Sequence, residues 1–80
     1  MTNDFFLRAL EEMCDAPEGS FEPATRLSDM MGWDSLTVVK FIAFLDTEYG
    51  VTVESEKVYA CQTAADLEAL ADAQRSAQQS

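Results

Sequence analysis

The sequence contains no histidine, and this absence removes several kinds of active site at once. Acid–base catalysis by histidine and zinc sites with histidine ligands are both excluded. Basic residues are also scarce, with 5 lysines and arginines against 15 aspartates and glutamates, so the net charge is −10. A surface this acidic repels phosphate groups, which argues against nucleic acids and anionic membranes as partners. It attracts a basic protein partner instead.

Cysteines and long apolar runs are scarce as well. Cys14 and Cys61 lack the spacing of a CxxC pair, and no base stands near either in sequence to activate a nucleophile. No apolar run approaches the roughly 18 residues of a membrane span, and the chain does not start like a secretory signal. We therefore expect a cytoplasmic, monomeric, non-catalytic protein with free thiols. No acidic spacing matches a calcium loop, so no metal site is predicted.

What the chain does contain is enough apolar material for one small core. Hydrophobic residues make up 48% of its 80 residues, which is ordinary for a folded domain. A chain of this length buries only about 60% of its unfolded surface, too little for a deep catalytic cavity. We expect one domain over residues 1–72. Residues 73–80 are rich in glutamine, serine and alanine and predict a flexible tail.

Apolar periodicity predicts a first helix from about Asp4 to Cys14, capped by Asn3 or Asp4. Its inner face is expected to comprise Phe6, Leu7, Leu10, Met13 and Cys14. Its outer face is expected to comprise Arg8, Glu11 and Glu12. Residues 15–33 then predict a long loop, with Phe21, Leu27 and Met30 as apolar anchors. Loops of this length in small domains are often functional.

A second helix is predicted from about Asp34–Ser35 to Tyr49, where Gly50 ends it. Residues 54–61 predict one or two helical turns with Val58 and Tyr59 facing inward. Thr63 predicts the start of the last helix, because Asp66 completes a capping box with it. The sequence therefore predicts an all-α fold, a small bundle of three main helices and one short helix with a long first loop.

The segment Gly32-Trp33-Asp34-Ser35-Leu36 carries the main functional signal. Taken alone, Asp34 and Ser35 indicate only a helix cap, since both residue types are favoured there. The serine, however, follows a long loop and a glycine and opens the most apolar helix. In this arrangement the chain resembles the acyl carrier protein family, including peptidyl carrier domains. The family's second helix is similar to residues 41–51. The start of its last helix is similar to the segment Thr63-Ala64-Ala65-Asp66-Leu67.

The resemblance implies that Ser35 is the attachment point of 4′-phosphopantetheine, which a phosphopantetheinyl transferase adds from coenzyme A. It gives Asp34 a part in recognition by that transferase. The arm would hold an acyl or aminoacyl group as a thioester. The stand-alone carrier would present this cargo to separate activating, transferring and downstream biosynthetic enzymes. The cargo stays open among fatty acyl, polyketide, amino acid and hydroxy acid.

At 100° per residue, one face of the second helix turns away from its apolar core side. This face predicts a partner-binding surface beside Ser35, formed by Leu36, Val39, Lys40, Ala43 and Thr47. Lys40 stands where many fatty-acid carriers have an acid, which favours a specialised pathway of polyketide, fatty-acyl or nonribosomal-peptide type. Trp33 is expected to pack over the loop, and its position also makes it a candidate for contact with the arm. The alternatives are a small acidic interaction module and a degenerate carrier homologue, both without the prosthetic group.

Overall fold

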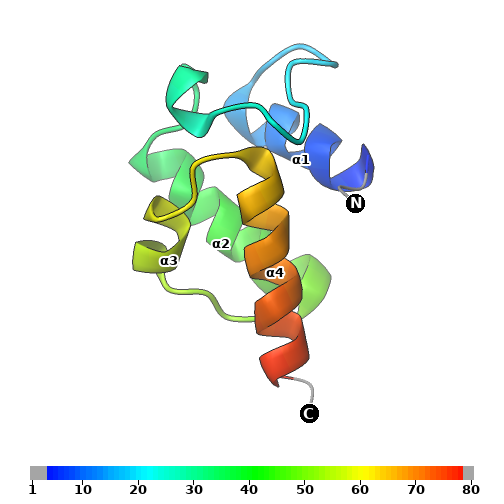
Figure 1. Ribbon diagram of the computed structural model, residues 1–80, viewed down its shortest axis with the longest axis vertical. Coiled ribbons are helices and arrows are strands. Elements are labelled where there is room, and N and C mark those ends of the chain that lie inside the picture. Colours follow the sequence, from blue (N-terminus) through cyan, green and yellow to red (C-terminus); the bar gives the residue numbers. More distant parts are fainter. Residues whose placement is uncertain (1–3, 79–80) are drawn as a thin grey trace.

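The computed structural model describes residues 4–78, which form four α-helices and one short 3-10 helix (Figure 1). In chain order these are α1 (Asp4–Cys14), η1 (Leu27–Asp29), α2 (Ser35–Tyr49), α3 (Ser55–Tyr59) and α4 (Ala64–Gln78). No strand occurs between residues 4 and 78, where the single β-bridge joins Arg26 to Thr63. The predicted all-α bundle with three main helices, one short helix and a long first loop is confirmed.

Helix α2 is the centre of the bundle, because it contacts α1, α3 and α4, and α3 also packs on α4. Figure 1 shows α1 near the top of the view, α4 crossing in front of α2, and the short α3 to the left of α4. Three phenylalanines, Phe6, Phe21 and Phe41, are fully buried where these elements meet. Burying large aromatic side chains supplies much of the stability of so small a core.

The loop between α1 and α2 is fastened to the start of α4. Backbone N–H groups of Ala64 and Ala65 donate to the carbonyl oxygens of Thr25 and Pro23, at 3.1 Å and 2.9 Å. The first N–H groups of a helix have no partner within the helix, so the loop satisfies two of them. The predicted capping box is also present, since the Thr63 hydroxyl accepts from Asp66 N and the Asp66 carboxylate accepts from Thr63 N.

Two predicted orientations are wrong. Tyr59 was expected to face inward, but it is 59% exposed at the end of α3, where Val58 alone fills the core position. Glu11 was expected on the outer face of α1, but it is only 3% exposed. Its carboxylate Oε2 accepts hydrogen bonds of 2.9 Å from the backbone N–H groups of Gly19 and Phe21. Arg8 Nη2 lies 3.2 Å from the same oxygen.

The last helix is longer than the predicted domain. Residues 73–80 were assigned to a flexible tail, whereas α4 continues through Gln78. Arg75 on this extension lies over the ring of Tyr49, with 5.9 Å between the guanidinium carbon and the ring centroid. This contact between α4 and α2 is consistent with helix beyond residue 72. Residues 79–80 and the alternative cap Asn3 lie outside the described residues, and the flexibility of the tail stays a prediction.

Candidate functional site: the start of helix α2

Asp34 is the residue that caps α2. Its backbone is extended, and its side-chain Oδ1 accepts a 3.0 Å hydrogen bond from the backbone N–H of Thr37. This bond contributes most to holding the pKa of the Asp34 carboxyl below its ordinary value of 3.8, and the Thr37 side chain and neighbouring N–H groups contribute less. At neutral pH the carboxylate is therefore charged, and its exposed face is available to a cation of a partner.

A close backbone contact fixes the direction in which the chain enters α2. Gly32 lies against the end of α1, where an added Cβ would be 2.9 Å from Cα of Cys14 and nearer still to its carbonyl oxygen. Only glycine allows this approach without a shift of the Cys14 backbone. The buried hydroxyl of Thr37 donates a 2.6 Å hydrogen bond to the Gly32 carbonyl oxygen. The loop is thus tied to both α1 and α2 immediately before Ser35.

Trp33 supports the same corner from the side. It is half-buried, and its ring meets the ring of Phe41 edge-on at a centroid distance of 5.9 Å. Trp33 thus has a packing role, but its ring contact is with α2, and its packing over the loop stays a prediction. Its N–H group on the backbone donates to the carbonyl oxygen of Met30 at 3.1 Å, which continues the fixed path of the loop into α2.

Ser35 is the first residue of α2, and its side chain is exposed. Across the part of the chain that the structure describes, its hydroxyl makes no hydrogen bond, because the cap is provided by Asp34. The sequence left both residues open as caps, and the structure assigns that role to Asp34. Among the described residues, the Ser35 hydroxyl therefore makes no hydrogen bond that the fold needs, and it is accessible to another protein.

Leu36 and Val39, which follow Ser35, are each 63% exposed. Lys40, Ala43 and Thr47 are exposed on the same side of α2, as the helical spacing predicted. Exposed apolar side chains that gather beside an accessible group form a surface suited to a protein partner. The structure thus brings all seven predicted site residues to one stretch of α2, with Asp34 and Ser35 at its end.

Sequence reasoning did not single out Thr37 or Glu11, the two buried polar residues that position this corner and its loop. Thr37 had a usable signal, since a threonine three residues after a capping aspartate lies in the first turn, where its hydroxyl can meet the preceding loop. Glu11 had none, because its partners are backbone N–H groups that carry no side-chain signature.

Comparison with known families agrees with this arrangement. The family model described as phosphopantetheine attachment site matches residues 4–71, from the start of α1 into α4. The chain belongs to the phosphopantetheine attachment site family. Domains of this family hold covalently attached 4′-phosphopantetheine and are generally non-catalytic carriers that work with phosphopantetheinyl transferases and biosynthetic enzymes. No curated protein and no solved structure matches the chain. Among the described residues, no helix of this phosphopantetheine-binding domain is long and apolar enough to cross a membrane.

Proposed function

We propose that Ser35 carries the 4′-phosphopantetheine and that the chain is a stand-alone acyl carrier serving separate enzymes. The observation that supports this proposal is that Asp34 and Ser35 have different roles at the start of α2. Asp34 accepts the capping hydrogen bond, whereas the exposed Ser35 hydroxyl has no partner among residues 4–78. A hydroxyl that served only the fold would be expected to make the capping bond itself.

The residues at this corner fit the group chemically. Helix α2 has 15 residues, so its amino-terminal end presents backbone N–H groups and a partial positive charge to a phosphodiester on Ser35. When bound, the arm supplies a thiol that holds an acyl or aminoacyl group as a thioester. Asp34 keeps its capping bond during attachment, and its charged carboxylate can meet the metal ion of the transferase.

The exposed face of α2 is the proposed contact for enzymes that load or use the cargo. Leu36, Val39 and Ala43 would supply apolar contact, and Lys40 and Thr47 would supply the polar edge. Lys40 places a positive charge on the helix of a carrier whose net charge is −10. A partner that matches this face needs an acid opposite Lys40, which would select against partners built for a uniformly acidic helix. This requirement supports a specialised polyketide, fatty-acyl or nonribosomal-peptide pathway.

The test is intact-mass spectrometry after incubation with coenzyme A, magnesium and a broad-specificity phosphopantetheinyl transferase. The native chain should gain one phosphopantetheinyl group, and Ser35→Ala should gain none. Ser55→Ala is the matched control, because Ser55 is also exposed, opens a helix and follows an acidic residue, Glu54. That variant should be modified like the native chain, since α3 has only five residues.

Two further variants separate the roles of the site residues. Ser35→Ala should leave the free energy of unfolding unchanged within about 0.5 kcal/mol, because no bond is removed. Asp34→Asn keeps an oxygen for the Thr37 N–H but removes the charge, so it should slow the transferase without unfolding the protein. The native chain could stay unmodified although the transferase is active, and protein purified from its own source could also lack the group. Both results together would favour the interaction module or the degenerate homologue.

A further inference from the structure

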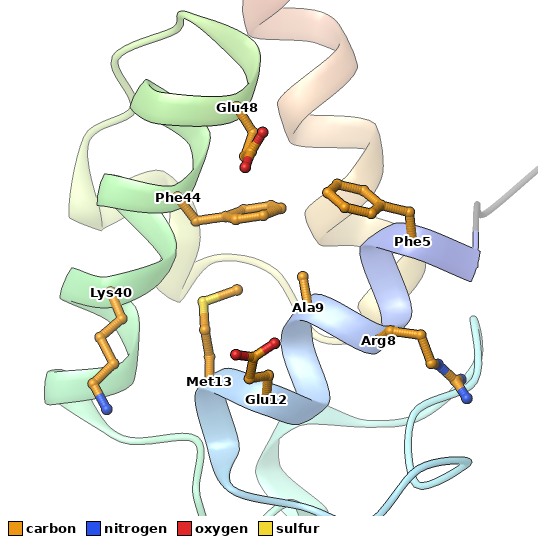
Figure 2. Close-up of a pocket in the computed structure, with 8 residues that line it drawn as sticks. All are labelled: Phe5, Arg8, Ala9, Glu12, Met13, Lys40, Phe44 and Glu48. Atoms are coloured by element: carbon orange, nitrogen blue, oxygen red, sulfur yellow. The ribbon is translucent and has the colours of Figure 1, made fainter.

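Helices α1 and α2 leave an open groove between them, with a volume of about 480 Å³ (Figure 2). Each wall is a row of side chains spaced four residues apart: Phe5, Ala9 and Met13 on α1, and Lys40, Phe44 and Glu48 on α2. The first and last residues of each row are eight positions apart, which is about 12 Å or two helical turns. Rows of this spacing are the ridges between which another helix packs.

The middle of the groove is aromatic and only partly covered. Phe5 is 56% exposed, and its ring lies 6.1 Å from the ring of Phe44. Phe44 is half-buried, and its other contacts are with the rings of Phe6, Phe41 and Tyr49 inside the bundle. The groove thus has a rigid aromatic wall backed by the core, which is the kind of surface that accepts an apolar anchor from a partner.

The charges around the rings are arranged asymmetrically. Figure 2 shows Glu48 and Glu12 on either side of the two rings, with the Glu48 carboxylate directed toward the gap. The side chains of Arg8 and Lys40 point away from the rings in the same view. Arg8 is moreover engaged by Glu11 at 3.2 Å, with Glu18 at 4.0 Å. The Glu48 end of the groove is therefore negative, whereas at the other end Glu12 is accompanied by Lys40. The chain as a whole has a net charge of −10.

We propose that this groove docks a short amphipathic helix of a partner protein, one that carries apolar anchors and has lysine or arginine at the end that meets Glu48. Apolar anchors would lie on Phe5 and Phe44, and the basic residues would meet Glu48. A second copy of the chain is a poor occupant, because two surfaces of the same strong charge repel.

The groove adjoins the partner face beside Ser35, because Lys40 belongs to both, but its aromatic centre lies farther along α2. Phe44 follows Ser35 by nine residues, which is about half a turn around the axis of α2. A partner bound in the groove therefore leaves Ser35 accessible. Such a site would hold the carrier on one enzyme or scaffold while another enzyme acts at the start of α2. The proposal does not depend on modification of Ser35.

The experiment is a selection from a random display library of peptides of about four helical turns, with the unmodified full chain as bait. Enriched peptides should be helical, with apolar residues at helical spacing and lysine or arginine at one end. Fluorescence anisotropy then measures their affinities for variants. Phe5→Ala should weaken binding about thirtyfold, as expected for a central anchor. Tyr59→Ala, which removes an equally exposed aromatic ring from α3, should have no effect.

Charge is tested with a matched pair on one helix. Glu48→Gln should weaken binding and reduce its salt dependence, whereas Asp46→Asn, an exposed acid on the opposite side of α2, should change neither. The Ser35→Ala variant should bind the peptides with the affinity of the native chain. A failure of attachment at Ser35 can therefore be told apart from a failure of docking in the groove. The proposal is overturned if no peptide is enriched, if enriched peptides lack basic residues at one end, or if Phe5→Ala leaves their affinity unchanged. Sedimentation showing a native dimer that Phe5→Ala dissociates would assign the groove to a second copy instead.

Discussion

Replacing Glu11 by alanine should destabilise the fold far more than any other change of one acid on α1. Glu11 Oε2 accepts two 2.9 Å bonds from backbone N–H groups, and the residue is 3% exposed. Phe21 N–H is buried and would lose its only acceptor there, whereas Gly19 is exposed and its N–H would regain water. The orphaned buried donor costs about 1–3 kcal/mol, and the exposed one about 1 kcal/mol.

The partner Arg8 adds less, because its side chain is 33% exposed and water screens the unpaired charge. The total loss is about 3 kcal/mol, out of about 4–12 kcal/mol for a domain of 80 residues. The melting temperature should fall by about 12–24 °C. Glu11→Gln keeps one acceptor oxygen and should lose about half as much.

Urea denaturation followed by circular dichroism measures the difference, with Glu12→Ala as the control. Glu12 is the next residue on the same helix and is exposed, so its replacement should change stability by less than about 0.5 kcal/mol. If Glu11→Ala and Glu12→Ala behave alike, Glu11 is a surface residue, as the helical wheel indicated, and the loop-anchoring argument is wrong.

Three other outcomes are expected. Gly32→Ala should destabilise the protein by about 1–3 kcal/mol in the same denaturation assay, because its Cβ would collide with the Cys14 backbone; a neutral effect would contradict the close contact. Burial raises the pKa of both the Cys14 and Cys61 thiols, so the native thiols should react with an aromatic disulfide reagent more slowly than free cysteine near neutral pH. Hydrogen bonds from backbone N–H groups, that of Gln62 first, lower the pKa of Asp66 below 3.8. The folded state then releases this proton more readily than the unfolded state. The contribution of Asp66 to stability is therefore present above about pH 4 and is lost as the pH falls below it. Denaturation at a series of pH values should show this loss of stability, and Asp66→Asn should make it smaller.

Much of the fold follows from local sequence signals. The bounds of α1 coincide with its apolar periodicity, and α2 ends where Gly50 adopts a left-handed backbone conformation with φ of 67°. The capping box at Thr63 and Asp66 was readable because both of its members are side chains three residues apart. Signals of this kind depend only on neighbours along the chain, so a single sequence contains them.

The features that were not predicted depend on contacts across the chain. Glu11 is buried because a loop eight to ten residues later turns its N–H groups inward. Tyr59 is exposed because α3 ends immediately after a single buried residue, Val58, and a helix of five residues presents only one side to the core. At the site, spacing predicted the exposed face of α2 but left two capping residues open, since aspartate and serine are equally suited to that role.

The separation of Asp34 and Ser35 also bears on how such a chain changes over generations. The residue that stabilises the start of α2 is the neighbour of the residue proposed for attachment. Loss of the Ser35 hydroxyl would therefore leave no folding defect for quality control to detect. Only selection on carrier activity can preserve the serine, whereas Asp34 and Gly32 are also preserved by the need to fold. Descendants that lose the arm would remain well-folded proteins, open to reuse for binding alone.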